Sequence, residues 1–274
     1  MMNVGFKKCR FGAFAYTRKF ADVCIKPLFM NVLVCISSVP DTTSKITFTS
    51  DHTALDTSGI QFIVNPYDEI ALSKAIDLTE GGKGTVTVIN VGEFNTEAII
   101  RKALATGADQ AVRVNAQARD AWFVAHQIAN YAKDKGFDFI LTGRESIDYN
   151  GAQIAAFVGE LLGIPSVSAA KKVNIEDGRA TVECDIEGGK EVLSIPPPLI
   201  VGVAEGVAEP RIPNMRGIMS ARTKPLDVRE AIEVPVLSEI IRYEALQPRG
   251  AVTLVDADEV EKLVELLHHN ERVI

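Results

Sequence analysis

Short apolar runs and amphipathic stretches alternate along the middle of the chain. Residues 32–36 are apolar throughout and are followed by polar residues and Pro40, a pattern that predicts a buried strand. Similar runs predict strands over 85–91, 110–114 and 137–142.

Helical spacing of apolar residues fills the gaps between these strands. Asn65 and Pro66 open one such stretch, which ends at the glycine-rich residues 81–84. Further helices are predicted around Ile100, over 120–135 and over 151–162. Strand and helix alternate about every 25 residues, which predicts an α/β fold with a Rossmann-like parallel sheet and helices on both faces.

The pattern changes after Ser166. Short apolar strands separated by Asp177-Gly178 and Gly188-Gly189 predict an antiparallel extension of the sheet, followed by one more strand over 199–203. Residues 205–225 show neither helical nor strand periodicity, which is typical of a functional or disordered segment.

The remaining segments carry weak patterns. The threonine-rich residues 42–58 are expected to form a hairpin or an irregular excursion. Residues 226–274 are acidic and thinly patterned apart from a short amphipathic helix over 256–267, so we expect an arm that packs against another chain. The main α/β domain is therefore expected to span 30–225.

Composition narrows the functional classes. The net charge of −7 over 274 residues argues against binding nucleic acid. No apolar run is long enough to cross a membrane. Four cysteines without a CxxC pair indicate reduced thiols and a cytoplasmic location. No metal site is expected, because the paired histidines near the C-terminus are more typical of solvated surface.

The first 29 residues differ from the rest of the chain. They carry six Lys and Arg against a single Asp, and they end before a further methionine, Met30. A dispensable upstream extension, a targeting peptide and a structural arm all stay open. The absence of serine and of a continuous apolar run disfavours the two usual targeting signals.

Several common nucleotide and catalytic motifs are absent, including the Walker A loop and GxGxxG. The best nucleotide-site candidate is the loop at residues 142–153, which links a predicted strand end to a predicted helix start. At the start of a helix, the backbone N–H groups of residues 151–153 would point toward a bound anion. A plain strand-to-helix loop with Asn150 as the N-cap explains the same residues, and the pattern does not decide between the two.

Four segments together resemble the β subunit of the electron transfer flavoproteins. They are residues 65–71, 100–109, 143–153 and 209–222, in that order along the chain. The resemblance extends from Met30 to about residue 230. It implies a heterodimeric electron carrier rather than an enzyme, so no catalytic residue is expected.

The resemblance also implies the cofactors. In this family the α subunit holds most of the FAD site, and the β subunit binds AMP. Carried over by position, the nucleotide-binding residues are Cys35, Asn65, Pro66, Tyr67, Asp68, Val91, Gly143, Arg144, Ser146, Ile147, Asp148, Tyr149, Asn150, Gly151, Ala152, Gln153 and Ile154.

The loop departs from one familiar family form. Residues 153–156 read Gln-Ile-Ala-Ala where many members have Gln-Thr-Gly-Gln, and Tyr149 and Asn150 replace acidic or small residues. Phosphate contacts are therefore expected to rest on backbone amides. AMP is favoured, and a second FAD, as in electron-bifurcating members, is the alternative.

Residues 205–225 match the family's recognition loop, which docks on acyl-CoA or other flavin dehydrogenases before electrons pass to a respiratory acceptor. Met215 occupies the apolar anchor position. The expected docking residues are Arg211, Met215, Arg216, Ile218, Met219 and Arg222.

Two further functions stay open. A regulatory domain that binds an adenine nucleotide would share the fold and the loop. An enzyme that activates its substrate with ATP is disfavoured, because residues 37–41 read Ser-Ser-Val-Pro-Asp where a Ser-Gly-Gly-rich loop is expected.

Overall fold

The computed structural model describes residues 29–176, 178–246 and 250–273. Nearly all of the predicted leader, the first residue of the turn predicted at Asp177, and residues 247–249 and 274 of the predicted arm lie outside the described residues. The described chain forms two compact units. One contains residues 29–44 and 60–239, and the other contains 45–59 and the C-terminal segment from 240.

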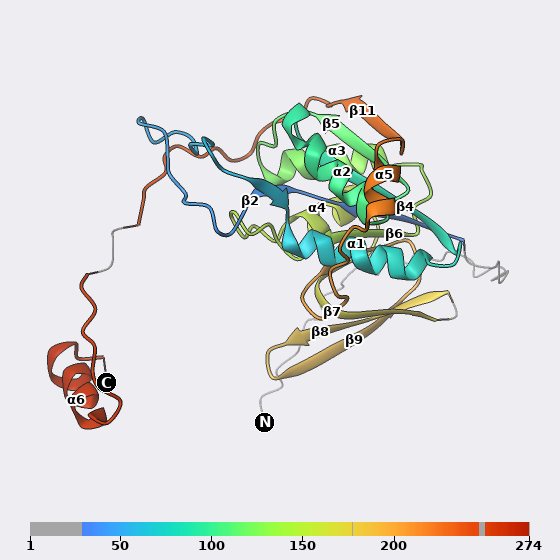
Figure 1. The fold of residues 1–274 in the computed structure, drawn as a ribbon. Coiled ribbons are helices and arrows are strands. Elements are labelled where there is room, and N and C mark those ends of the chain that lie inside the picture. The colour runs from blue at the N-terminus through green and yellow to red at the C-terminus, as the bar shows by residue number, and fades with distance from the viewer. Residues whose placement is uncertain (1–28, 177, 247–249, 274) are drawn as a thin grey trace, which may run out of the picture. The chain divides into compact units, whose positions relative to one another are not determined.

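In the described part of the first unit, nine strands form one sheet (Figure 1) in the order β11-β5-β4-β1-β6-β10-β7-β8-β9. The strands from β11 to β10 are parallel, β7 begins parallel to β10, and β8 and β9 continue from β7 as an antiparallel extension. The bounds are β1 Met30–Cys35, β4 Gly84–Val91, β5 Gln110–Asn115, β6 Phe139–Gly143, β7 Ser166–Glu176, β8 Arg179–Ile186, β9 Gly189–Ile195, β10 Leu199–Val203 and β11 Leu226–Glu230.

Helices cover both faces of this sheet. The helices α1 (Pro66–Thr79) and α2 (Glu97–Thr106) pack on one face, and α3 (Ala121–Ala132) and α4 (Ile154–Leu162) pack on the other. The predicted fold class is confirmed.

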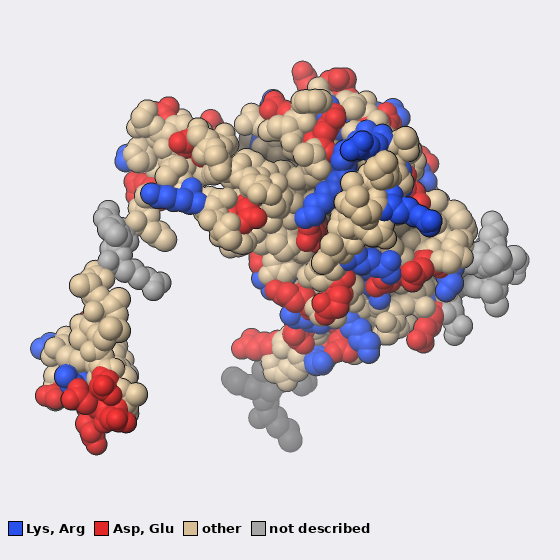
Figure 2. Space-filling model, viewed as in Figure 1, with Lys and Arg blue, Asp and Glu red and all other residues tan. Residues whose placement is uncertain are grey.

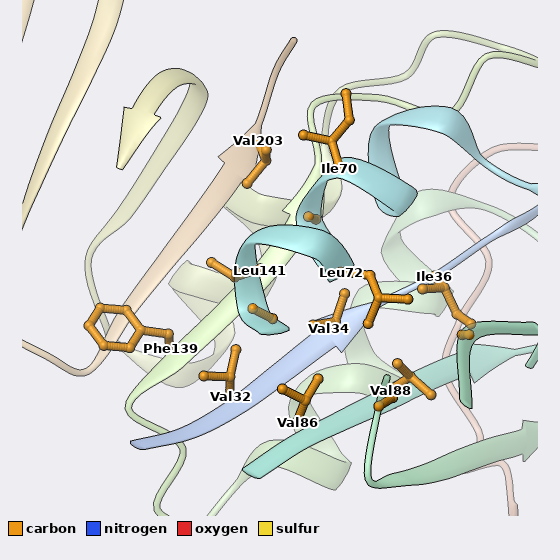
Figure 3. Close-up of a cluster of buried hydrophobic side chains, with 14 of the residues drawn as sticks. Val32, Val34, Ile36, Ile70, Leu72, Val86, Val88, Phe139, Leu141 and Val203 are labelled. Atoms are coloured by element: carbon orange, nitrogen blue, oxygen red, sulfur yellow. The ribbon is translucent and has the colours of Figure 1, made fainter. Parts of the chain in front are cut away.

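Strand β1 shows why residues 32–35 are all apolar. Successive side chains of a strand point to opposite faces, so Val32 and Val34 meet α1 and α2 while Leu33 and Cys35 meet α3 and α4. Figure 3 shows the first of these layers, with Leu72 of α1 beside the valines of β1 and β4. Burying each such side chain contributes about 1.5–3 kcal/mol.

The helix predicted over 151–162 begins later than expected. It starts at Ile154 with Gln153 at the N-cap, because Asn150 and Ala152 both have a φ of 52° and cannot be helical. Asn150 is therefore not the N-cap. The helix predicted over 120–135 ends at Ala132, and Asp134, with a φ of 60°, lies beyond it.

A helix and a strand after residue 214 were not predicted. Residues 215–221, expected to lack periodicity, form the short helix α5 (Met215–Ala221), which packs on α2. Strand β11 pairs with β5 at the edge of the sheet, and mainly Leu226 contributes to the core. The chain continues over α3, where the side chain of Gln127 both donates to and accepts from the backbone of Ile232.

A separate hairpin leaves the carboxyl end of β1. Its strands β2 (Ser38–Pro40) and β3 (Phe62–Val64) pair antiparallel and return the chain to the start of α1.

The second unit joins the predicted excursion to the C-terminal segment. Residues 45–59 are irregular apart from one antiparallel bridge between Phe48 and Leu55. The Tyr243 ring stacks on Phe48 at 4.9 Å, and its backbone N–H donates to the carbonyl of His52. The predicted C-terminal helix is present as α6 (Val260–Glu265), followed by a π-helical turn at Leu266–Asn270. Among the described residues, no helix is long and apolar enough to cross a bilayer.

Candidate functional site

A cavity of about 400 Å³ opens at the carboxyl ends of β1, β4, β5 and β6. The chain leaves β1 through α1 toward β4 on one side, and it later reaches β6 on the other side of β1. This reversal makes a topological switch point, where ligands bind in open α/β sheets. The volume is within the range of small-molecule sites.

The lining has an apolar part and a polar part. Cys35, Ile89 and Val91 at the strand ends, with Val124 and Ile128 of α3, form an apolar surface. The opposite part consists of residues from the 143–153 loop and the turn after β4. Such a site fits a flat ring system joined to a polar group.

Most of the predicted nucleotide residues line this cavity. They are Cys35, Asp68, Val91, Gly143, Arg144, Ser146, Asp148, Tyr149, Ala152, Gln153 and Ile154. The other predicted residues lie beside the wall without lining it: Asn65, Pro66, Tyr67, Ile147, Asn150 and Gly151. The ligand contacts of both sets stay a prediction.

Other lining residues were not predicted. Those that directly follow a parallel strand could have been found if the strand order were known: Ile36, Ser37, Ser38, Gly92, Glu93, Asn95, Thr96, Gln117 and Ala118. The rest carry no sequence signal for this site: Phe62, Ile89, Val124 and Ile128. Thr142 and Glu145 also line the cavity, and both lie in the candidate loop at 142–153.

Asp68 is a buried acidic residue in the lining of the cavity. One of its carboxylate oxygens accepts hydrogen bonds from the backbone N–H and hydroxyl of Ser37, at 2.8 and 2.7 Å, and the other accepts from the Gly143 N–H at 2.9 Å. The residue is only 5% exposed. Burial outweighs these hydrogen bonds and raises the pKa of Asp68 to about 6.

Burial and the nearby Asp68 charge raise the pKa of the Cys35 thiol well above its usual range, which makes Cys35 an unreactive residue of the cavity wall.

The loop itself is held in an unusual conformation. Asn150 and Ala152 adopt left-handed φ values, which cost about 1–2 kcal/mol for a residue such as alanine. Between them, Gly151 lies under the ring of Tyr149, and a Cβ at residue 151 would come within 2.3 Å of a ring carbon. Backbone strain of this kind is concentrated at ligand sites, which favours a functional loop over a plain connection.

A polar network links the loop to the end of β10. The Arg144 guanidinium lies 5.1 Å from the centre of the Tyr67 ring and pairs with Glu145. The Tyr67 hydroxyl donates to Glu205 at 2.7 Å, and this bond lowers the pKa of Glu205 to about 2. Tyr67 of α1 therefore links the 143–153 loop to the segment that begins at residue 205.

The expected docking segment presents an apolar surface. In and around α5, Ile212, Met215, Ile218 and Met219 are all exposed, Met215 at 74%. Arg216 and Arg222 are also exposed, whereas Arg211 pairs with Asp77 of α1. Figure 2 shows basic side chains on both sides of an uncharged surface in the region where Figure 1 labels α5.

Long-range hydrogen bonds and a side-chain cap hold this helix in place. The Arg101 guanidinium donates to the carbonyls of Ala221 and Lys224 at 2.8 and 2.9 Å, and Asn214 caps the helix through the Gly217 N–H. The Lys224 ammonium in turn donates to carbonyls at the end of α2. The exposed methionines thus project from a fixed base.

Comparisons with known proteins identify the family of this chain. A family model described as the electron transfer flavoprotein domain matches residues 53–234. The electron transfer flavoprotein subunit beta of Bacillus subtilis (strain 168) is 35% identical over 259 residues, covering 89% of this chain and 100% of that protein. The protein of the same name from Syntrophomonas wolfei is 33% identical over 250 residues, covering 89% of this chain and 98% of its own length. This chain therefore belongs to the family of electron transfer flavoprotein β subunits.

Proposed function

We propose that this chain pairs with an electron transfer flavoprotein α subunit, binds AMP in the cavity at the switch point, and serves as an electron carrier rather than an enzyme. The observation that carries the proposal is the cavity at the carboxyl ends of β1, β4 and β6, lined by most of the 143–153 loop. The family supports the heterodimer, and the cavity supports the nucleotide.

The chemistry of the lining suits a mononucleotide. The apolar strand ends offer a surface for adenine, and the loop offers polar groups for ribose and phosphate. Among the described lining residues Arg144 is the one basic side chain, and Asp68, Glu93, Glu145 and Asp148 are acidic. The phosphate would therefore rest mainly on backbone amides of the loop, since carboxylates repel it.

The alternative ligand is a second FAD. FAD contains the whole of AMP joined to a flavin mononucleotide, so it needs far more space. A cavity of about 400 Å³ is near the lower end of small-molecule sites, which favours AMP.

The redox chemistry belongs to the FAD that the heterodimer would hold, which accepts and donates electrons reversibly. This chain's residues would hold the nucleotide, orient the partner subunit and present the docking surface. Electron transfer needs no general acid or base from them.

We further propose that α5 docks on acyl-CoA or other flavin dehydrogenases. Met215 would enter an apolar pocket of the partner, and Arg216 and Arg222 would steer acidic surfaces toward it. Electrons would then pass to a respiratory acceptor, with the carrier in the cytoplasm.

The test is to co-express the chain with its α subunit, denature the purified heterodimer and identify the released nucleotides. One FAD and one AMP per heterodimer support the proposal. Two FAD molecules would replace it with the bifurcating alternative. A colourless chain that binds an adenine nucleotide without an α subunit would favour a regulatory domain instead.

A further inference from the structure

Two side chains at the start of α1, Asn65 and Asp68, bind the ligand loop directly. We infer that they form a brace that sets the position of residues 143–147 and thereby controls nucleotide retention, with Asn65 acting as a positioning residue that does not touch the nucleotide. The inference deepens the proposed function and rests on it for the identity of the ligand.

Asn65 is completely buried, and both ends of its side-chain amide bind the loop. Its Nδ2 donates to the Glu145 carbonyl at 2.9 Å, and its Oδ1 accepts from the Ile147 N–H at 3.3 Å. These two hydrogen bonds hold the backbone on either side of Ser146, which lines the cavity. Asn65 itself is not among the lining residues, so the proposed effect of Asn65 on the nucleotide is exerted through the loop.

The use of this amide is unusual for its position. Asn65 is the N-cap residue of α1, where an asparagine side chain ordinarily accepts a hydrogen bond from the first turn of its own helix. Here the side chain makes no capping bond and instead binds a segment about 80 residues later in the chain. A hydrogen bond that would stabilise the start of α1 is thus replaced by two hydrogen bonds that hold the loop backbone at Glu145 and Ile147.

Asp68 completes the brace three residues later. Its carboxylate joins Ser37, just after β1, to Gly143 at the end of β6. The backbone of Asn65 also donates to the Ser37 carbonyl at 3.1 Å. The ends of two neighbouring parallel strands and the ligand loop are therefore bound to one rigid helix start.

The brace predicts a measurable change before any nucleotide binds. In the nucleotide-free heterodimer, Asn65→Ala removes two hydrogen bonds from the loop, and we expect the amides of residues 143–147 to exchange hydrogen about tenfold faster. AMP should then bind about tenfold more weakly, because the loop must be ordered on binding.

Asn95→Ala is the matched control, since Asn95 is an exposed asparagine that lines the same cavity on another turn. It should leave exchange at 143–147 unchanged. Asn65→Ser can cap α1 through its hydroxyl but lacks the amide that binds Glu145 and Ile147, so its exchange should rise as in Asn65→Ala. It also decides the question if Asn65→Ala yields no heterodimer.

Unchanged exchange at 143–147 in the nucleotide-free Asn65 variants would overturn the brace, whether or not AMP binding falls. Weaker AMP binding with unchanged exchange would identify Asn65 as a direct contact. If the wild-type heterodimer binds no AMP, the proposed ligand fails, while the exchange measurement still decides the role of Asn65.

Discussion

Helix α5 approaches α2 so closely that a single methyl group should displace it. A Cβ at Gly217 would lie 2.2 Å from the carbonyl oxygen of Ala105. Carbon–oxygen contacts in proteins are about 3.3 Å or longer, so Gly217→Ala requires a shift of about 1 Å. The obstructing atom belongs to the backbone of α2, which is packed on the sheet. We therefore expect α5 to move.

The cost of this overpacking should be about 1–3 kcal/mol. For a unit of this size, that corresponds to a melting temperature lower by about 2–12 °C. The cavity lies among other elements, so the AMP and FAD content of the heterodimer should stay unchanged. If α5 is the docking surface, its displacement should slow reduction by a flavin dehydrogenase at least tenfold at limiting partner concentration, equivalent to about 1.4 kcal/mol of docking energy.

The measurement pairs thermal unfolding with stopped-flow reduction of the bound flavin. Gly189→Ala in β9 is the matched control, because a Cβ there meets no atom within 4 Å. Equal melting temperatures for Gly217→Ala and Gly189→Ala would refute the packing argument. A lower melting temperature with an unchanged reduction rate would confirm the packing and refute docking through α5.

Three further outcomes are expected. Met215→Ala should slow reduction by a dehydrogenase while leaving flavin content unchanged and stability within about 0.5 kcal/mol of wild type, because the side chain is 74% exposed; lost flavin would show a structural role instead. Gly143→Ala should weaken AMP binding at least tenfold in calorimetric titration, because its Cβ would lie 2.3 Å from an Asp68 carboxylate oxygen and 2.7 Å from the Tyr67 Cβ; unchanged affinity would show that the loop can retreat freely. Burial raises the pKa of Asp68 in the folded state to about 6, above the ordinary value of 3.8, so the folded state binds the proton more tightly than the unfolded state. The free energy of unfolding should therefore fall as pH rises from about 4 to 7, by up to about 3 kcal/mol. Denaturant unfolding of wild type and Asp68→Asn across this pH range checks the sign, since the variant lacks this titration.

The parallel core could be predicted from the sequence because its strands are buried on both faces. Residues 32–36 face apolar layers on both sides of the sheet, so none of the five is polar. Such a continuous apolar run can be recognised from the sequence alone. Helix α5 and strand β11 gave no such pattern. Most side chains of both are exposed, and long-range contacts such as those of Arg101 and Gly217 hold α5 in place.

The sequence predicts the part of the cavity lining that lies in one continuous loop, but not the parts that other segments of the chain contribute. The loop at 143–153 follows a strand and was recognised by its position and by resemblance. The turn at 92–96 and the α3 residues Val124 and Ile128 line the same cavity, yet nothing local marks them. Their role depends on β4 and β6 lying on either side of β1, and the strand order is a property of the whole fold.

The start of α1 shows how one motif can serve both the local helix and the distant loop. Pro66 at the first helical position has no N–H to satisfy, and the Asn65 carbonyl accepts from the N–H groups of Asp68 and Glu69 at 2.9 and 3.0 Å. The helix therefore begins without a side-chain cap, and the carboxylates of Asp68 and Glu69 in its first turn favour the positive end of the helix dipole. These features leave the Asn65 amide available for Glu145 and Ile147. The sequence Asn-Pro-Tyr-Asp-Glu predicts a helix start, and the same residues explain why the asparagine can bind the loop at residues 145–147 instead of capping its own helix.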